Sequence, residues 1–140
     1  MVAPATALGI DLHLFAQSSQ DSAAQITNHI VGDYTNLQEV LSFAQSCDVV
    51  TFEHELVPLS VIKGLESAGI KVYPTSAAFQ YSQDKALMRE KLRDFPSPEF
   101  QVITSSESVV QYPVIAKSIS GGYDGRGVWK VESSAQLTEI

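Results

Sequence analysis

The stretch DVVTFEHELVPLSVIKGLESAGIKVY, residues 48–73, decides the fold of this chain. It opens with a continuous β-branched and aromatic run, Asp48–Phe52, which is typical of a strand covered on both faces. A helix is predicted from Pro58 to Gly69, because proline is favoured in the first turn of a helix and glycine just past the last. The run Ile70–Tyr73 predicts a second strand. A strand, a helix and a strand with short connections predict a βαβ unit, and therefore a parallel sheet with a right-handed crossover.

The residues before this stretch continue the alternation of strands and helices. Apolar and mixed residues alternate over Ile10–Phe15, which predicts another strand. An amphipathic helix is predicted between the two strands, because apolar residues recur there at intervals of three and four. These residues are Leu37, Val40, Leu41, Ala44 and Cys47. Thr35, with Gln38 three positions on, gives the pattern of a capping box at the start of this helix.

The residues after position 73 predict a helix and then a change of character. The helical pattern runs from Ser76 to about Asp94, with Ser82 as an internal cap, and it ends at Phe95–Pro98, where two prolines favour an extended linker. Three strands are predicted beyond the linker: Glu99–Thr104, Val114–Lys117 and Val128–Val131. We therefore predict a parallel α/β domain over residues 1–95 and a second, more antiparallel domain over residues 96–140.

Both ends of the sequence have the pattern of interrupted elements. Residues 1–9 read as the last turns of a helix that closes on Gly9, and a parallel α/β unit normally begins with a strand. We therefore expect that first strand upstream of Met1. Ser133 and Ser134 look like the cap of a helix that is too short to recover its nucleation cost. The expectation is a fragment, or a gene model that starts at an internal methionine.

Composition excludes several classes of protein. The 140 residues carry 9 basic and 16 acidic side chains, a formal net charge of −7, which lacks the basic surface needed to neutralise a nucleic-acid backbone. Apolar runs fall short of the roughly 18 residues that span a bilayer, and the N-terminus has no signal-peptide pattern. Cys47 is the single cysteine, which excludes a disulfide framework and leaves it a small core residue. We expect a cytoplasmic protein with neither a nucleic-acid nor a membrane partner.

The strongest chemical signal is the segment from Ser120 to Gly127. Four of the eight glycines of the chain lie between Gly121 and Gly127, a density that indicates unusual backbone angles or the close approach of a ligand. A plain hairpin loop between two strands is the alternative. Lys117, three residues before the segment, and Arg126 within it favour a lid over a nucleotide triphosphate. Because a strand follows the segment instead of a helix, it is neither a Walker A loop nor a dinucleotide fingerprint.

Three of these motifs together resemble a known family. Gly122–Gly127 preceded by Lys117, together with Ser82–Lys85 and Val50–Glu53 upstream, resembles the 5-(carboxyamino)imidazole ribonucleotide synthases. These enzymes are ATP-grasp carboxylating ligases of purine biosynthesis, and the resemblance covers essentially all 140 residues. It implies a Rossmann-like pre-ATP-grasp domain of α/β class without its first strand over residues 1–95. The start of an ATP-grasp α+β lid would follow over residues 96–140.

The resemblance also implies roles for individual residues. Lys117 and Arg126 would act in catalysis, and Glu53 would accept a hydrogen bond from the ribonucleotide substrate. Lys85 stands where the family usually has arginine, so the charge is kept and the bidentate fork is lost. The residues implied to bind ATP are Lys85, Lys117, Gly122, Tyr123, Asp124, Gly125, Arg126, Gly127 and Val128.

The reaction that the resemblance implies consumes ATP and bicarbonate. A carboxyphosphate forms and carboxylates the exocyclic amine of aminoimidazole ribonucleotide, and ADP and phosphate leave. No residue of this chain is predicted to bind metal, and the ligands of Mg²⁺ are expected beyond residue 140. We accordingly expect no synthase activity from these residues alone. The resemblance further implies that the full-length enzyme is a homodimer.

Other functions remain open from the sequence. A different ATP-grasp ligase would share the fold and the loop, and a non-catalytic module would bind ATP without turnover. A nicotinamide-dependent Rossmann enzyme is disfavoured, because the dinucleotide fingerprint is absent. His54 and Glu55, next to Glu53, are predicted to be ordinary loop residues, and His13 and His29 are predicted to be structural.

Overall fold

The computed structural model describes residues 2–109, 111–122 and 125–140. The chain divides into two compact units, Met1–Phe79 and Gln80–Ile140. The domain boundary expected at residue 95 stays a prediction, because a compact unit and a domain need not end at the same residue. No helix among the described residues combines the length and the apolar character needed to cross a membrane.

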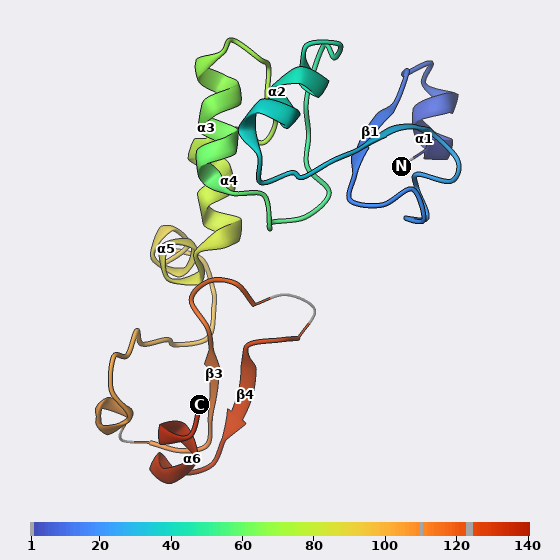
Figure 1. The fold of residues 1–140 in the computed structure, drawn as a ribbon. Helices are drawn as coiled ribbons and strands as arrows, with labels where there is room; N and C mark the ends of the chain where they lie inside the picture. The colour runs from blue at the N-terminus through green and yellow to red at the C-terminus, as the bar shows by residue number, and fades with distance from the viewer. Residues whose placement is uncertain (1, 110, 123–124) are drawn as a thin grey trace. The chain divides into compact units, whose positions relative to one another are not determined.

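The first unit begins with a helix and a two-stranded parallel sheet (Figure 1). Helix α1 spans Val2–Ala7 and is followed by Gly9 at φ 68°, as the sequence predicts. Strand β1, His13–Ala16, corresponds to the predicted strand over residues 10–15. It pairs in parallel with β2, Asn28–Val31, in the register His13 to Asn28 and Ala16 to Val31. The periodicity missed β2, because all four of its residues are exposed and it has no apolar face to detect.

The predicted βαβ unit is present, with less strand than expected. Helix α3, Leu59–Ser67, follows Pro58 and precedes Gly69 at φ 80°. The strands on either side reduce to one parallel bridge between Val50 and Val72. The Val50 N–H donates to the Lys71 carbonyl and the Tyr73 N–H donates to the Val50 carbonyl, both at 2.9 Å. The predicted parallel direction is confirmed, and the predicted strand lengths are wrong because the pairing extends over this single position among the described residues.

The core of the first unit lies between helices α2, Leu37–Ala44, and α3, which are side by side in Figure 1. Ile62 and Leu65 of α3 are fully buried. Phe52 packs edge-on against Phe79, with ring centroids 5.2 Å apart. The buried cluster consists of Val40, Ala44, Val50, Val57, Val61, Ile62, Leu65, Val72 and Phe79. Cys47 lies against this cluster, half-buried, as expected of a small core residue.

The cap of α2 is one residue later than the predicted box. Asn36 is the N-cap, and its side-chain oxygen accepts from the Gln38 N–H at 3.1 Å. Thr35 instead donates its N–H and its hydroxyl to the carboxylate of Asp33, and the pKa of Asp33 is lowered by the hydroxyl bond first and by the backbone bond second. The prediction of a Thr35 cap is therefore wrong, because α2 begins one residue later and the side-chain oxygen of Asn36 accepts the helix N–H.

The predicted helix over residues 76–94 is two helices. Helix α4 spans Ser76–Gln83 and α5 spans Lys85–Lys91. Asp84 separates them, and its side chain accepts from the Leu87 N–H at 2.9 Å. The expectation of a cap at Ser82 is wrong, since this residue lies inside α4.

The second unit contains a β-hairpin with a short helix packed on it (Figure 1). Strands β3, Val114–Lys117, and β4, Val128–Val131, are antiparallel, as predicted. Helix α6, Ser134–Thr138, forms against the expectation that it is too short, because the Ser133 hydroxyl caps it and Leu137 is buried. The strand predicted over Glu99–Thr104 is wrong. Those residues pair with no described strand, and a single 3₁₀ turn, η1, follows at Ser106–Ser108.

The start of α4 is held by a carboxylate from α3. Glu66 accepts the Ser76 N–H at 2.7 Å and the Ser76 hydroxyl at 2.6 Å. The hydroxyl bond, followed by the backbone bond, lowers the pKa of the Glu66 carboxyl below the ordinary value of a glutamate. The charged carboxylate binds Ser76 only in the folded chain, so these bonds stabilise the fold fully at a pH above the ordinary glutamate pKa. Their contribution is lost as the pH falls through the lowered pKa.

The variant Glu66→Gln tests this cap. Its melting temperature should fall less steeply than that of the wild type as the pH drops from about 6 to about 3, because the amide does not titrate. Circular dichroism melts across this range measure the difference. Glu99→Gln is the matched control, since Glu99 is exposed and bonds to no described residue. If the melting temperatures of the wild type, Glu66→Gln and the control all fall equally steeply with pH, the Glu66 carboxylate does not hold the start of α4.

Candidate functional site

The candidate site is built on the loop between β3 and β4, residues 118–127, called the glycine loop below. The antiparallel ladder pairs Lys117 with Val128 and then continues for one more bond, because the Ser118 N–H donates to the Gly127 carbonyl at 2.9 Å. The loop is therefore closed at its neck by backbone hydrogen bonds. Tyr123 and Asp124, two of the predicted ATP-binding residues, lie outside the described residues.

Glycine is required in this loop for two different physical reasons. Gly125 has φ 81° and open space around it, so its requirement is the left-handed backbone alone. A Cβ on Gly122 would lie 2.6 Å from the Arg126 carbonyl oxygen and 2.8 Å from the Ser118 hydroxyl. Gly127 combines both reasons, with φ 71° and a Cβ position 2.2 Å from the Ser118 hydroxyl. The described residues at the neck of the loop are thus closely packed against one another.

The start of α5 is attached to this loop. The Lys85 N–H donates to the Ile119 carbonyl at 2.9 Å, and the Lys85 ammonium is 3.5 Å from the Gly122 carbonyl. Asp84 caps the helix at the same point. The structure therefore brings Lys85 to the glycine loop from a distant part of the sequence. Its role towards a nucleotide stays a prediction.

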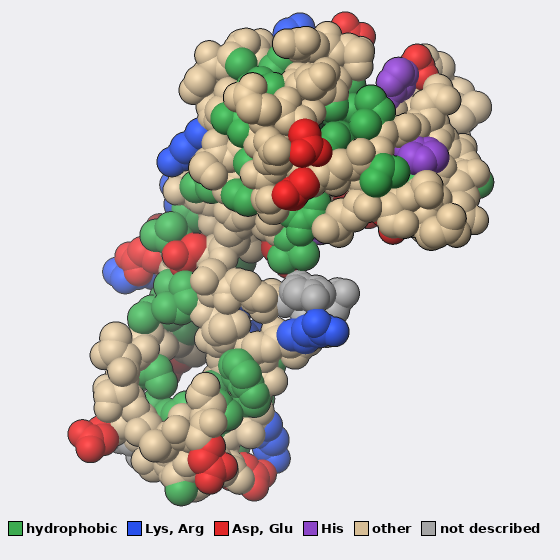
Figure 2. Space-filling view, in the orientation of Figure 1, with side chains coloured by type: hydrophobic (Ala, Val, Ile, Leu, Met, Phe, Trp, Pro, Cys, Tyr) green, Lys and Arg blue, Asp and Glu red, His purple; other side chains and the backbone are tan. Residues whose placement is uncertain are grey.

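The two faces of the hairpin differ in exposure. Directly opposed residues of an antiparallel pair share a face, so Lys117 and Val128 lie on one side with Ile115 and Lys130. Ile115 is 57% exposed and Val128 is 41% exposed, whereas Val131 on the other side is 1% exposed. The space-filling view shows hydrophobic side chains at the surface over β4 (Figure 2). We call the side with Ile115, Lys117, Val128 and Lys130 the open face.

The two lysines of the open face are in different electrostatic states. The Lys130 ammonium is 2.7 Å from the Glu132 carboxylate, which offsets its charge. The Lys117 ammonium is exposed and forms no hydrogen bond or ion pair with another residue that the structure describes. Lys117 also stands at the neck of the glycine loop, opposite Val128. A cation beside a glycine-rich turn and two exposed apolar side chains fits a ligand with an anionic end and an apolar ring.

Arg126 lies in the same loop. Its side chain is exposed, and its carbonyl oxygen faces Gly122 across the neck. The guanidinium is a planar donor fork suited to phosphate oxygens. The structure thus gathers Lys85, Lys117 and Arg126, the three predicted cationic residues, at one end of the hairpin.

Glu53 lies in the first unit, on the turn that follows the Val50 bridge. Its carboxylate is exposed, and the residues on both sides of it, Phe52 and His54, each make a ring contact, although His54 is itself exposed. Phe52 lies against Phe79, and the His54 ring meets Tyr34 edge-on with centroids 5.2 Å apart. His54 Nδ1 also accepts from the Leu56 N–H at 3.2 Å, so this residue, predicted to be an ordinary loop residue, is bonded within the turn. The packed neighbours fix the turn and leave the Glu53 carboxylate free to accept hydrogen bonds from a ligand.

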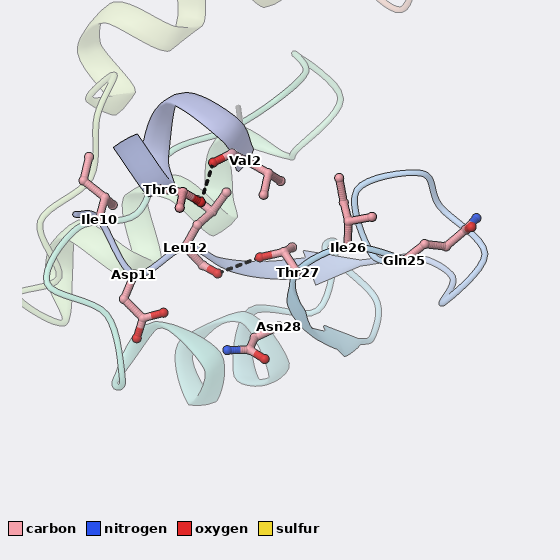
Figure 3. A pocket seen from close by; sticks show the side chains of 9 residues that line it. All are labelled: Val2, Thr6, Ile10, Asp11, Leu12, Gln25, Ile26, Thr27 and Asn28. Carbon is pink, nitrogen blue, oxygen red and sulfur yellow. Dashed lines mark hydrogen bonds between the residues drawn. The ribbon is translucent and has the colours of Figure 1, made fainter. Parts of the chain in front are cut away.

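A pocket of about 490 Å³ lies elsewhere in the first unit, between α1, β1 and the start of β2 (Figure 3). It is lined by Val2, Thr6, Ile10, Asp11, Leu12, Gln25, Ile26, Thr27 and Asn28. Two hydrogen bonds brace its walls, from the Thr6 hydroxyl to the Val2 carbonyl and from the Thr27 hydroxyl to the Leu12 carbonyl (Figure 3). None of the predicted site residues lines it, and its lining contains no lysine or arginine to meet a phosphate.

Sequence reasoning missed Ser118 and Asp84 as parts of the site. Both act through the backbone of their neighbours, so neither has the charge or the glycine pattern that marks a ligand contact. Asp84 carried a detectable signal, because an aspartate one residue before Lys85 and three before Leu87 fits a helix cap. Ser118 carried none, since nothing in the sequence shows which residue fills the centre of a glycine loop.

The chain thus combines a βαβ unit with an antiparallel hairpin that closes on a glycine-rich loop. Residues 1–83 match the family model described as the ribonucleotide synthetase preATP-grasp domain, and the chain belongs to that family. The predicted pre-ATP-grasp α/β fold is therefore confirmed.

Two relatives of this chain share one enzyme name. N5-carboxyaminoimidazole ribonucleotide synthase of Corynebacterium ammoniagenes is 37% identical over 149 residues, which cover 100% of this chain and 36% of the relative. The same enzyme of Mycobacterium leprae is 34% identical over 152 residues, covering 97% and 35%. The resemblance inferred from the glycine motif is confirmed. This chain spans about a third of the length of these relatives.

Solved structures agree on the fold. N5-carboxyaminoimidazole ribonucleotide synthetase of Thermotoga maritima matches with a TM-score of 0.86 at 23% identity, over 100% of this chain and 39% of that one. Carboxyaminoimidazole ribonucleotide synthase of Aspergillus clavatus, complexed with ATP, matches with a TM-score of 0.75 at 26% identity, over 99% and 39%.

The variants Gly127→Ala and Gly125→Ala separate the two demands on the glycine loop. Both residues have positive φ, so both substitutions carry a similar backbone strain of roughly 1–2 kcal/mol. Only at Gly127 does the new methyl group also displace the Ser118 hydroxyl, which should add about 1 kcal/mol for the lost hydrogen bond. Urea unfolding followed by the fluorescence of Trp129, the single tryptophan, measures the difference. If both variants lose the same free energy of unfolding, the Ser118 side chain moves aside without a measurable loss of stability.

Proposed function

We propose that this chain carries the phosphate-binding loop and a part of the substrate domain of an enzyme that makes N5-carboxyaminoimidazole ribonucleotide. Its substrates would be aminoimidazole ribonucleotide, bicarbonate and ATP. The observation that carries the proposal is Lys117, an ammonium without a described partner on the open face at the neck of the glycine loop. The names of the relatives and the ATP complex of the Aspergillus clavatus enzyme support it.

In this proposal the triphosphate of ATP lies against the glycine loop. The N–H groups of Gly122–Val128 donate to phosphate oxygens, and the ammonium of Lys117 approaches from the open face. Arg126 adds a two-pronged donor, and Lys85 reaches the same end of the hairpin from α5. Ile115 and Val128 offer an exposed apolar surface beside these cations.

The proposed reaction has two steps. A bicarbonate oxygen attacks the γ-phosphorus of ATP, the bond to the ADP oxygen breaks, and carboxyphosphate and ADP result. The exocyclic amine of the ribonucleotide then attacks the carboxyl carbon, loses a proton and releases phosphate. The first step spreads negative charge over the transferred phosphoryl group, which Lys117, Arg126 and the loop N–H groups would stabilise. A loop folded over the intermediate would limit its hydrolysis.

Glu53 would serve the other substrate. Its exposed carboxylate, held on a turn between packed neighbours, would accept a hydrogen bond from the ribonucleotide. The ends of parallel strands are where ligands collect in open α/β sheets, which supports this place for the substrate.

The described residues do not by themselves make a magnesium site. No three histidine, cysteine, aspartate or glutamate side chains among them come together as metal ligands. The proposal therefore routes no step through Mg²⁺, and ligands beyond residue 140 stay a prediction. The homodimer and the cytoplasmic location stay predictions as well.

The variant Lys117→Ala tests the nucleotide site. It should raise the dissociation constant of ATP about tenfold or more, because it removes a charge-assisted contact. Isothermal titration calorimetry of the 140-residue chain with ATP measures the change. Lys130→Ala is the matched control, because Lys130 occupies the same face and is paired with Glu132.

Two results would contradict the assignment. The first is an equal loss of ATP affinity in Lys117→Ala and Lys130→Ala, which would reflect the overall charge of the hairpin. The second is an equal loss in Lys117→Ala and Glu53→Ala, which would remove the separation between a nucleotide side and a substrate side.

A further inference from the structure

Ser118 occupies the centre of the glycine loop. Its N–H and its hydroxyl both donate to the Gly127 carbonyl, at 2.9 and 3.4 Å. The same hydroxyl fills the space that a Cβ on Gly127 or on Gly122 would need, at 2.2 and 2.8 Å. Two glycines that are distant along the loop are therefore packed against one side chain.

The side of the hairpin on which Ser118 lies decides what kind of role it can have. Lys117 points to the open face, and successive residues of a strand point to opposite faces. Ser118 therefore points away from the face that carries the Lys117 ammonium, and it is half-buried. A ligand on the open face would meet Lys117 and the loop backbone without touching the Ser118 hydroxyl.

We propose that Ser118 is a positioning residue that holds the glycine loop in the shape that binds phosphate. This inference rests on the proposed function, because it assigns to the loop a phosphate ligand. Without the hydroxyl, the Gly127 carbonyl accepts only the Ser118 N–H. The space beside Gly122 and Gly127 that the hydroxyl fills would be empty.

The neighbouring residue explains why one hydroxyl has this effect. The Ile119 carbonyl accepts from the Lys85 N–H, so α5 anchors the loop just after Ser118. The ladder anchors it just before, at the pair of Lys117 and Val128. The described end of the glycine loop reaches β4 through Gly125 and Gly127, which both have positive φ. The Ser118 hydroxyl, at the beginning of the loop, donates to the Gly127 carbonyl at its end. Its loss should therefore alter the loop and leave the rest of the hairpin in place.

The experiment compares Ser118→Ala with Ser120→Ala in the 140-residue chain. Ser120 is the matched control, because it lies in the same loop, is exposed and forms no hydrogen bond with a described residue. Dissociation constants for ATP and for inorganic tripolyphosphate are measured well below the melting temperature of each variant. Ser118→Ala should weaken both ligands by about three- to tenfold, as expected for one hydrogen bond, and Ser120→Ala should weaken neither.

The ligand pair separates a positioning role from a merely structural one. Loss of overall stability would lower the melting temperature without changing affinity in the fully folded chain. Equal affinities of Ser118→Ala and Ser120→Ala would overturn the inference. A loss for ATP with none for tripolyphosphate would overturn it too, because Ser118 would then act on the nucleoside end.

A second measurement needs no ligand and keeps the inference testable if the proposed function fails. In ¹⁵N-labelled chain, Ser118→Ala should shift the amide resonances of Gly122 and Gly127, and Ser120→Ala should leave both in place. If wild type binds neither ATP nor tripolyphosphate, the proposed function fails, and with it the phosphate part of the inference. Unchanged resonances in Ser118→Ala would reject the positioning role whatever the binding result.

Discussion

The pairing of Lys117 with Val128 is the constraint on which the candidate site depends. Side chains alternate between the two faces of a strand, so a slip of one residue in this register would exchange the faces of β3. Lys117 would then lie on the side that α6 covers, and Ser118 would face solvent. The burial of Val131 on β4 and of Leu137 on α6 opposes such a slip, because the slip would remove apolar side chains from the covered face of the described hairpin.

In the first unit, the packing of buried side chains holds the chain in place where the sheet is reduced to a single bridge. Val50 and Val72 form a single bridge, yet both are buried with Ile62 and Leu65 of α3. The position of the turn that carries Glu53 therefore comes from side-chain contacts around it more than from a continuous sheet. Such a turn tolerates an exposed carboxylate, because the residues that order it are its neighbours and not Glu53 itself.

The sequence predicted what depends on local pattern and composition. The glycine loop, both hairpin strands and α3 were all readable in this way. It did not predict which of two neighbouring candidates caps a helix: Asn36 caps α2 where Thr35 also fits, and Asp84 caps α5 where Ser82 also fits. The strand β2 depends on pairing with β1, and the Ser118 contacts depend on how the glycine loop folds back on itself, and periodicity records neither.

An acidic chain that binds a polyanion has to do so through local charge. The net charge of −7 acts weakly on a ligand, because salt screens exposed charges beyond roughly 8–10 Å. Within that range the decisive property is whether a cation is already engaged. Lys130 is offset by Glu132, and the ammonium of Lys85 is 3.5 Å from the Gly122 carbonyl, so Lys117 is less engaged than either of these lysines. The loop that Ser118 closes sets where that charge can act, which makes the backbone shape and the electrostatics of the site a single property.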